Sequence, residues 1–421
     1  MLLSLKINNC LIYNSEVEFS MRANMHYKRF PNNVVSINGI NVLKTAVLFG
    51  PNNSGKTSFV RIISALKGLM LGRGVTFQRN LFSNNPQIEI SVSFLGNGEE
   101  NLFEVKFDYH KNEFLYERFA QISQDKYKNQ KTVDLLVRDS ANKKYYSEDA
   151  GIEAAIRVTA KNNILIHLIN TDEFPNLKKI KKTIIDFASK IDIVDMNNIP
   201  LKKTIEMIKA SDEIHRKIVN FVLNADLYME DFKYLSDDEV KIALSPRETG
   251  NTAPQEKVLG LAAPLTEMLH LASVYKGITV PSILFDSTGT KKMAALASYV
   301  IDALENGRIL IVDELDNSLH FKLTRGIIAL FNNELNNSAQ LIATVHDVSL
   351  LDCQTLFRKE QIWFTHKDQE NAYLYSLAEF KSKESGVRDT SDLIEKYRKG
   401  VFGALPEPDL FRSLLEVKQN G

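Results

Sequence analysis

The sequence predicts an α/β protein with an antiparallel β meander and a helical insertion, and three patterns support this prediction. An apolar run from Thr45 to Phe49 leads into a glycine-rich loop and then an amphipathic helical pattern. A second apolar run, residues 308–314, lies far downstream and ends in two acids. Alternating segments between residues 88 and 119 are typical of antiparallel strands.

The first lobe is predicted to cover residues 1–150. Leu2–Asn9 indicates an opening strand, and Ser15–Phe19 indicates its partner. Short polar turns around Gly96 and His110 divide the later alternating segments. These predicted meander strands are Ile88–Phe94, Leu102–Asp108 and Phe114–Phe119.

Residues 50–57 fit the phosphate-binding pattern G-x-x-x-x-G-K-[ST]. Its glycines let backbone N–H groups approach phosphates, and the Lys56 ammonium can reach the β and γ oxygens. The Thr57 hydroxyl can ligate Mg²⁺. We therefore expect a bound nucleoside triphosphate, ATP, together with Mg²⁺. The predicted binding residues are Gly50, Asn52, Asn53, Ser54, Gly55, Lys56, Thr57 and Ser58.

The downstream acids complete the predicted chemistry. A buried parallel strand that ends in a carboxylate holds hydrated Mg²⁺, so Asp313 is the predicted metal ligand. Glu314 can then polarise an attacking water. Because Asp313 lies so far from Lys56, we expect an inserted region at residues 151–238 and a second lobe at residues 239–421.

The insertion is predicted to be mainly helical. Leu177–Ile191 and Ile199–Leu223 have helical spacing, whereas Val240–Leu244 is expected to be a strand that returns to the second lobe. Ser245–Gln255 is expected to be a loop. The insertion shows no sustained heptad repeat, so a long coiled coil is not expected. The lysines at 178, 179, 181 and 182 favour a solvated helix face over phosphate-backbone binding.

Three further segments carry a family resemblance. Ser287 and Gly289 open the helical segment Met293–Leu304, which alone would suggest a helix cap or an anion site. Placed before residues 308–314, they resemble the signature motif of ABC-type ATPases, in which one subunit contacts the γ-phosphate held by the other. Leu315–His320 resembles the D-loop of the Rad50, RecF and overcoming-lysogenization-defect ATPases.

The order of these motifs resembles a whole ABC-type P-loop ATPase head. A strand at Gln340–Val345 ends at His346, which resembles the switch histidine that senses the γ-phosphate. The resemblance implies Glu314 and His346 as catalytic residues, with Ser287, Gly289 and the D-loop residue Asp316 contributing to nucleotide binding. It also implies a homodimer or a higher even oligomer. Gln78 and Gln87 both remain candidates for the Q-loop glutamine.

The C-terminal third resembles stand-alone bacterial abortive-infection ATPases of the RloA-like type. Segments 350–352, 358–364, 373–380 and 395–406 carry this resemblance. It implies a regulatory ATPase of an anti-phage two-component system, with an effector partner encoded by the adjacent gene. The sequence departs from the family pattern at Val401–Gly403 and Thr365–Lys367, and we expect neither departure to touch the ATP residues.

Three other classes of function are alternatives to this regulatory ATPase. A DNA-repair head of the RecF or Rad50 kind, binding DNA ends or gaps, would show a basic surface or a long coiled coil. An overcoming-lysogenization-defect nuclease would need clustered acids after His346, and we find none there. A non-hydrolysing scaffold is disfavoured by Glu314.

Composition sets the remaining expectations. Lys and Arg total 52, as do Asp and Glu, so nucleic-acid binding is possible but not indicated by net charge. Two cysteines argue against a disulfide framework and favour a cytoplasmic protein. No apolar run reaches the roughly 18 residues of a membrane span, so no membrane association is expected.

Overall fold

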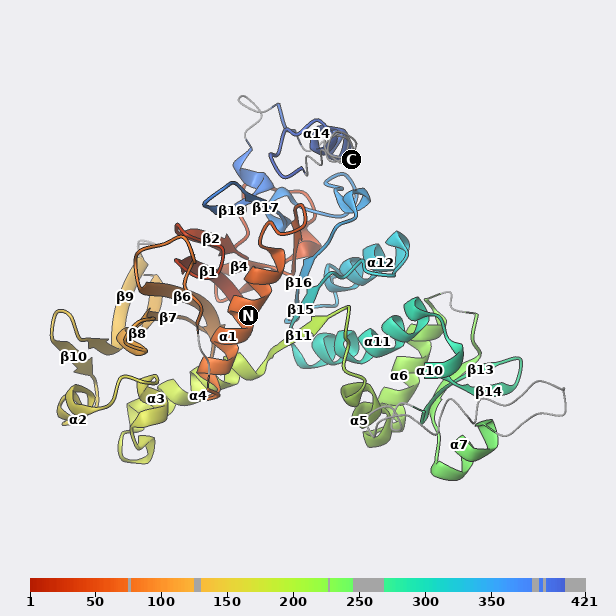
Figure 1. The fold of residues 1–421 in the computed structure, drawn as a ribbon, viewed down its shortest axis with the longest axis horizontal. Coiled ribbons are helices and arrows are strands. Elements are labelled where there is room, and N and C mark those ends of the chain that lie inside the picture. Colours follow the sequence, from red (N-terminus) through yellow and green to blue (C-terminus); the bar gives the residue numbers. More distant parts are fainter. Residues whose placement is uncertain are drawn as a thin grey trace, which may run out of the picture. The chain divides into compact units, whose positions relative to one another are not determined.

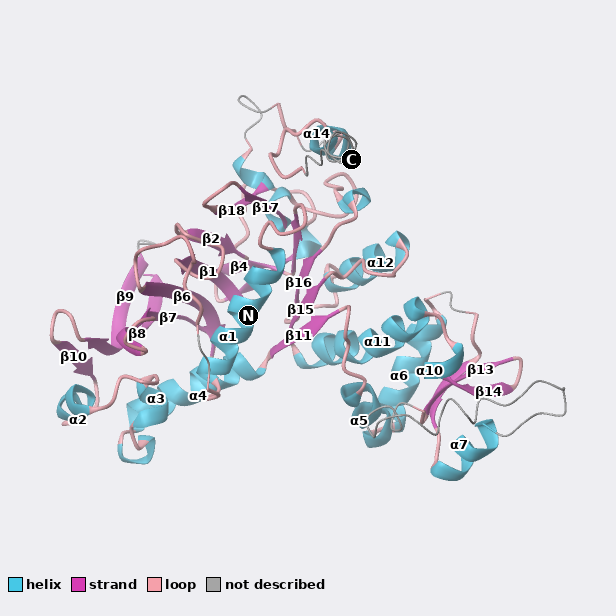
Figure 2. Cartoon of the chain, in the orientation of Figure 1, coloured by secondary structure: helices cyan, strands magenta, loops and turns pink. Residues whose placement is uncertain are grey.

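The computed structural model describes residues 1–74, 77–124, 130–225, 228–244, 269–380, 386–388 and 391–405 (Figure 1). The chain divides into two compact units. Unit 1 comprises residues 1–189 and 343–421, and unit 2 comprises residues 190–342. Both units mix helices and strands (Figure 2).

Unit 1 contains a seven-stranded antiparallel sheet in the order β10-β9-β8-β7-β6-β1-β2. Its strands are β1 (Leu2–Asn8), β2 (Val17–Ser20), β6 (Gln87–Gly96), β7 (Glu99–Asp108), β8 (Glu113–Gln124), β9 (Gln130–Asp139) and β10 (Lys144–Ser147). The predicted opening pair and the meander are therefore confirmed. The structure extends the meander by β9 and β10, which the sequence analysis missed.

A second group of strands in unit 1 leads into the glycine-rich loop. β5 (Thr45–Phe49) lies parallel to β17 (Ile362–Lys367), which pairs antiparallel with β18 (Ala372–Ser376). A separate hairpin joins β3 (Val34–Ile37) to β4 (Ile40–Leu43). Every residue of β5 is buried, as the continuous apolar run predicted.

Five α-helices complete the described part of unit 1. They are α1 (Lys56–Met70), α2 (Ile152–Val158), α3 (Leu165–Leu168), α4 (Pro175–Ser189) and α14 (Leu393–Arg398). Phe59 of α1 lies with its ring centroid 4.9 Å from that of Phe19 on β2, which also lies 4.9 Å from Trp363 on β17. Phe187 of α4 stacks on Phe94 of β6 with centroids 4.0 Å apart. These aromatic contacts fix both helices to the strands.

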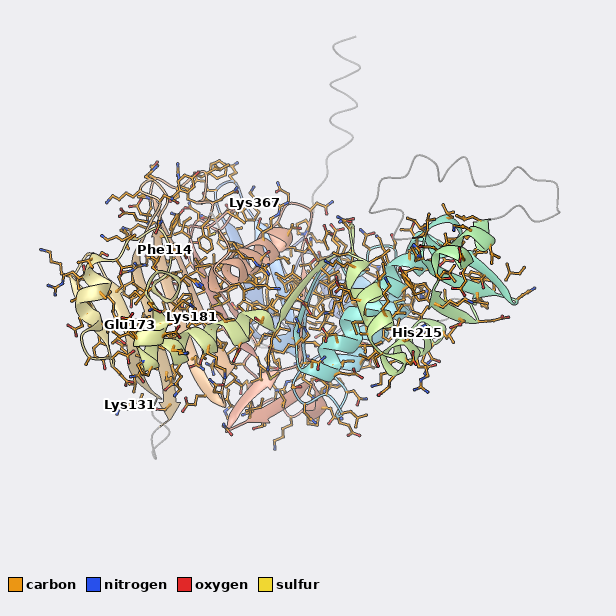
Figure 3. All side chains as sticks on the ribbon, turned by 90° about the horizontal axis from the view of Figure 1, so that it is seen from below. Phe114, Lys131, Glu173, Lys181, His215 and Lys367 are labelled. Atoms are coloured by element: carbon orange, nitrogen blue, oxygen red, sulfur yellow. The ribbon has the colours of Figure 1, made fainter. Side chains whose placement is uncertain are left out.

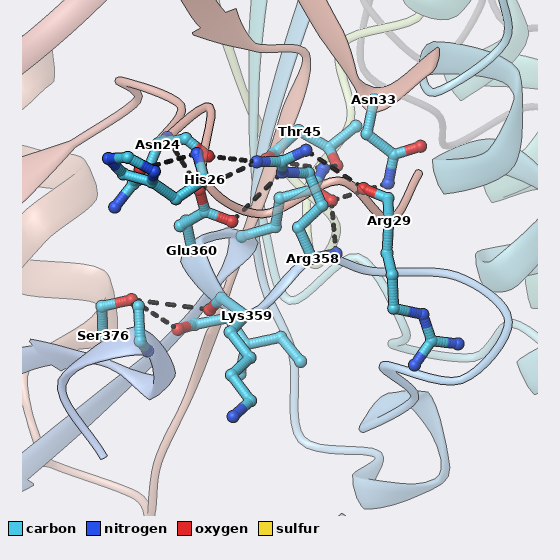
Figure 4. Close-up of polar contacts among 12 residues, drawn as sticks. Asn24, His26, Arg29, Asn33, Thr45, Arg358, Lys359, Glu360 and Ser376 are labelled. Atoms are coloured by element: carbon cyan, nitrogen blue, oxygen red, sulfur yellow. Dashed lines mark hydrogen bonds and ion pairs between the residues drawn. The ribbon is translucent and has the colours of Figure 1, made fainter. Parts of the chain in front are cut away.

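A buried polar network fixes the start of β5 (Figure 4). The Gln361 amide donates to Thr45 Oγ1 at 2.6 Å, and the Asn33 amide donates to Gln361 Oε1 at 2.7 Å. Arg358 Nε donates to Glu360 Oε2 at 3.1 Å, and its Nη2 donates to the carbonyl of Asn24 at 2.8 Å. Because these buried groups satisfy one another, the network holds the segment before β3 against the start of β17.

Unit 2 contains two sets of paired strands. β11 (Ile191–Asp195) runs parallel to β15 (Ile309–Asp313), with Asp195 opposite Asp313. β12 (Asp231–Tyr234), β13 (Leu271–Tyr275) and β14 (Ile278–Pro281) form an antiparallel sheet. The boundary between the units falls within β16 (Gln340–Thr344).

The described helices of unit 2 are α5 (Lys202–Ala210), α6 (Asp212–Leu223), α7 (Asp237–Leu244), α10 (Ser282–Phe285), α11 (Thr288–Asn306) and α12 (Phe321–Phe331). Helices α5, α6 and α11 contribute to one apolar cluster, and α7 and α10 contribute to another. Ile208 of α5, Ile218 of α6 and Ala297 of α11 belong to one buried cluster with Phe232 and Leu271. The small Ala297 lets α11 lie close to its neighbours.

A cluster of ion pairs links four elements of unit 2. Lys203 Nζ lies 2.8 Å from Asp192 Oδ2 and 2.5 Å from Asp302 Oδ2. Arg308 Nε lies 2.6 Å from Asp192 Oδ2 and 3.2 Å from Asp302 Oδ2. These four side chains come from β11, α5, α11 and the residue before β15, so the cluster fixes the start of the acidic strand.

The prediction of a strand at Val240–Leu244 is wrong, because these residues end helix α7. Ser236 and Glu239 form reciprocal contacts at the start of this helix: Ser236 N–H donates to Glu239 Oε2 at 2.8 Å, and Glu239 N–H donates to Ser236 Oγ at 3.4 Å. This capping arrangement and the acids of the first turn favour a helix over the β-branched pattern. The predicted loop Ser245–Gln255 lies outside the described residues.

Figure 3 labels two positions of the predicted insertion, Lys181 on α4 and His215 on α6. Lys178 Nζ, in the same lysine run, lies 2.8 Å from Asp172 Oδ1. His215 Nε2 lies 2.8 Å from the carbonyl oxygen of Phe232. Both contacts lie within the predicted insertion.

Candidate functional site

The predicted phosphate loop connects β5 to α1 in unit 1. A Cβ added to Gly50 would lie 2.3 Å from Thr365 Oγ1, and one added to Gly55 would lie 2.7 Å from Ile12 Cδ1. Gly55 also has φ +120°, which an L side chain rarely adopts. The loop therefore needs glycine at both ends, as a cradle of backbone N–H groups requires.

Lys56 is buried, and its ammonium lies inside this loop. Nζ donates to the carbonyl oxygen of Gly50 at 2.6 Å and to that of Pro51 at 3.0 Å. Thr57 is exposed at the first turn of α1, and so are Asn52 and Asn53 in the loop. The buried cation and the exposed hydroxyl at a helix N-terminus fit a phosphate with a bound Mg²⁺.

Thr365 and Tyr13 lie outside the motif and hold the loop in place. Ser54 Oγ donates to the carbonyl of Pro51 at 2.8 Å and lies 2.5 Å from Thr365 Oγ1. The Tyr13 hydroxyl donates to the carbonyl of Gly55 at 3.1 Å, and burial raises the pKa of that hydroxyl. The expectation that Thr365–Lys367 would not touch the ATP residues is therefore wrong for Thr365. No sequence pattern marked Tyr13, because it supports the loop from the turn between β1 and β2.

His346 follows the end of β16 and is exposed. The N–H of Val345 donates to the carbonyl of Leu48 at 3.0 Å, within unit 1. This bond sets the residue before His346 beside β5, two positions ahead of Gly50. Asp347 then caps a short 3-10 helix, because its Oδ1 accepts from the N–H of Ser349 at 2.9 Å.

The two Q-loop candidates differ in their surroundings. Gln78 is exposed, and its carbonyl accepts from the N–H of Leu11 at 2.8 Å. Leu11 lies in the same turn as Tyr13, which contacts Gly55. Gln87 is instead the first residue of β6, where it pairs with Asp108. The carbonyl of Gln87 accepts from Asn9 Nδ2 at 2.7 Å, so both candidates bond to the loop between β1 and β2 that contains Tyr13.

The predicted acidic residues lie in unit 2 at the end of β15. Asp313 is buried, and its carbonyl accepts from the N–H of Met196 at 3.1 Å. Glu314 has φ +57°, an unusual value for a side chain of this size. Its Oε2 accepts from the amides of Asn197 and Asn317, each at 3.0 Å. No sequence motif marks Asn197.

The predicted signature residues also lie in unit 2. Ser287 caps α11, because its Oγ accepts from the N–H of Thr290 at 3.1 Å. The helix therefore begins at Thr288, earlier than the predicted Met293. A Cβ at Gly289 would lie 2.8 Å from the carbonyl oxygen of Ser318, so the start of α11 packs directly on the D-loop that contains Asp316.

A buried carboxylate precedes the signature. Asp286 Oδ2 accepts from the hydroxyls of Ser273 and Ser282, each at 2.5 Å. Its Oδ1 accepts from the Tyr275 hydroxyl at 2.8 Å, and burial together with this carboxylate raises the pKa of Tyr275 to about 12. Asp286 therefore fixes the peptide that leads into Ser287 against β13.

Over the part of the chain that the structure describes, no group of three or more His, Cys, Asp or Glu residues could hold a metal ion. No helix within the same ranges is long and apolar enough to cross a membrane.

Residues 46–352 match the family described as "AAA domain, putative AbiEii toxin, Type IV TA system". Among solved structures, the SMC head domain from Thermotoga maritima is similar at 12% identity and a TM-score of 0.42, covering 89% of this chain and 98% of that one. An SMC head bound to the C-winged helix domain of ScpA is similar at 13% identity and a TM-score of 0.43, covering 89% and 97%. No curated protein matches the chain.

Proposed function

The chain belongs to this AAA-domain family. On that premise we propose that it is an ABC-type P-loop ATPase related to Rad50 and RecF, which hydrolyses ATP and controls a partner effector. The observation that carries the proposal is the phosphate loop. Its two glycines admit no side chain, and the buried Lys56 ammonium lies against the loop carbonyls. A loop of this shape recognises a polyphosphate rather than a neutral ligand.

Different residues of the chain would carry out the separate tasks of hydrolysis. Lys56 would hold the β and γ phosphate oxygens, and Thr57 and Asp313 would hold Mg²⁺, which supplies charge neutralisation when bound. Glu314 would orient the attacking water, and His346 would contact the γ-phosphate. Gln78 and Gln87 both remain candidates for the Q-loop glutamine, because each accepts a hydrogen bond from the loop that contains Tyr13.

We propose that the active unit is a homodimer or a higher even oligomer. Ser287 and Gly289 would then contact the γ-phosphate held by the second copy. An exposed serine at the start of the long helix α11 suits this role, because helix N-termini favour anions.

The biological role is an extension of this chemistry. The family description mentions a type IV toxin–antitoxin system, and the C-terminal segments resemble abortive-infection ATPases. We propose that the chain is the regulatory subunit of a cytoplasmic anti-phage system, in which nucleotide-driven dimerisation restrains or releases an effector encoded by the adjacent gene. Among the residues that the structure describes, we find no observation that favours the alternative DNA-repair function.

Two measurements test the proposal. The purified chain should release phosphate from ATP with Mg²⁺ and lose this activity with a chelator. Cells that carry the chain and its neighbouring gene should resist phage, whereas cells with the neighbouring gene and a Lys56→Ala chain should not. Absence of phosphate release would contradict the enzymatic proposal, and unchanged protection by the variant would contradict nucleotide control.

A further inference from the structure

A chain of side-chain hydrogen bonds surrounds Glu314 within unit 2. The Asn197 amide donates to Glu314 Oε2 at 3.0 Å, and so does the Asn317 amide, also at 3.0 Å. Asn317 Nδ2 in addition donates to Asn197 Oδ1 at 2.7 Å. The carboxylate therefore lies between two amides that also contact each other.

Lys292 extends this chain to the signature helix. Its Nζ donates to Asn317 Oδ1 at 3.0 Å and to Ser318 Oγ at 3.2 Å. An ammonium group can only donate, so it fixes Asn317 Oδ1 towards itself. The Asn317 amide nitrogen must then face Glu314 and Asn197, which sets the direction of every bond in the chain.

The backbone makes both ends of this arrangement rigid. Asp195 Oδ1 accepts from the N–H of Asn197 at 2.8 Å, and the N–H of Met196 donates to the carbonyl of Asp313 at 3.1 Å. On the other side, the N–H of Asn317 donates to the carbonyl of Glu314 at 2.8 Å. The turn after β11 thus lies beside the end of β15.

We propose that Asn197 and Asn317 are positioning residues for Glu314, and that Lys292 couples their geometry to the signature helix. The inference rests on the proposed ATPase function and deepens it. Lys292 is one helical turn beyond Gly289, which packs on the Ser318 carbonyl. If contact with a partner's nucleotide displaced the start of α11, the D-loop would move with it. The hydrogen bonds from Asn197 and Asn317 to Glu314 would then change.

The first test replaces the amide beside β11. Asn197→Ala should lower kcat about 10- to 100-fold and leave ATP affinity unchanged, because a loosely held carboxylate orients water poorly. Asn198→Ala is the matched control, since the Asn198 side chain is exposed in the same turn and its backbone bonds to Asp195. In a Glu314→Gln background, Asn197→Ala should lower kcat no further.

The second test examines the coupling to α11. Lys292→Met should lower kcat at unchanged ATP affinity, and Lys292→Arg should restore part of the loss. Lys291→Met removes the same charge from the same turn, but Lys291 Nζ donates to the carbonyl of Ile283 at 3.0 Å instead. This control should therefore keep wild-type turnover.

A third measurement needs no nucleotide. Thermal unfolding of Asn197→Ala, Glu314→Ala and the double variant should give non-additive Tm shifts, because both single changes break the same bond. Additive Tm shifts, or turnover losses that persist unchanged in the Glu314→Gln background, would overturn the inference. A wild-type chain without ATPase activity would instead overturn the proposed function, so the two failures are distinguishable.

Discussion

The hydroxyl groups of Ser54 and Thr365 lie 2.5 Å apart, although 311 positions separate the two residues in the chain. Ser54 belongs to the phosphate loop, and Thr365 lies on β17, beside β5. Thr365 Oγ1 would also meet any side chain at Gly50. The C-terminal segment therefore takes part in shaping the candidate phosphate loop of unit 1.

Replacing Thr365 by valine should weaken nucleotide binding while keeping the fold. Valine keeps the β-branched shape but removes the Thr365 hydroxyl that contacts Ser54, a loss of about 1 kcal/mol, while Ser54 keeps its bond to the carbonyl of Pro51. We expect roughly a five-fold rise in the Kd for ATP, measured by calorimetric titration. Thr365→Ser retains the hydroxyl and should bind like the wild type. Equal affinity of the valine variant would show that the contact does not shape the loop.

Lys56→Ala should remove nucleotide binding, because the phosphates then lose their charge-assisted partner at the loop. Calorimetric titration with ATP and Mg²⁺ is the measurement. Lys67 lies on the same helix beyond the loop, so Lys67→Ala serves as a control with intact binding. Unchanged ATP affinity of the Lys56 variant would refute the assignment.

Glu314→Gln should keep ATP and Mg²⁺ binding and slow turnover by orders of magnitude. The amide preserves the shape of the side chain but cannot orient the water as a carboxylate does. Steady-state phosphate release and size-exclusion chromatography with ATP should show a slow enzyme trapped as a closed assembly. A variant with wild-type turnover would mean that Glu314 serves only as the polar end of β15.

A mixture of Lys56→Ala and Ser287→Arg chains should recover ATPase activity that neither chain shows alone. Each heterodimer would contain one site with an intact phosphate loop and an intact signature from opposite chains. Steady-state ATPase assays after confirmed subunit exchange test this. Because Ser287 caps α11, circular dichroism must first show that the arginine variant is folded. Activity that stays at the level of the separate variants would exclude action in trans.

The stability of unit 2 should depend on the ionised form of Asp192. Burial alone would raise the pKa of this carboxyl, but hydrogen bonds from Arg308 and Lys203 outweigh burial and lower the pKa below its usual value near 3.8. A lowered pKa in the folded state contributes stability above pH 3.8, and this contribution is lost as the pH falls through the folded-state pKa.

Asp192→Asn should therefore destabilise the protein by about 1–3 kcal/mol at pH 7, through loss of charged hydrogen bonds. Thermal unfolding between pH 3 and pH 7 is the measurement, and the difference in Tm from the wild type should shrink below about pH 4. Asp186→Asn, at an exposed position on α4, should show no such dependence. A constant difference across this range would disprove the role of the Asp192 charge.

Local patterns in the sequence predicted much of the fold. The apolar run Thr45–Phe49 forms β5 with the predicted bounds, and Gln340–Val345 forms β16 to within one residue. Both are short buried strands whose apolar runs have clear ends. The strand prediction for Val240–Leu244 is wrong because five residues with β-branched members fit either structure, and the capping contact of Ser236 lies before these residues in the chain.

Sequence motifs predicted the residues of the candidate site, but they did not predict the residues that support it. Lys56 and Glu314 are recognisable because their chemistry requires fixed neighbours in the sequence. Tyr13, Thr365 and Asn197 carry no such signal, because each acts through hydrogen bonds that span a long stretch of chain. Their positions depend on strand pairing and turn geometry, which a single sequence does not specify.

The close approach of Gly289 to the Ser318 carbonyl affects how variants of the signature should be interpreted. A side chain at position 289 would press on the D-loop of its own chain, whatever it did to a second copy. Loss of activity in such a variant would mix an intrachain distortion with an intersubunit defect. Substitutions at the exposed Ser287 therefore test contact between subunits more directly than substitutions at Gly289. Where other sequences carry a different residue at position 289, residues 317–318 should differ as well.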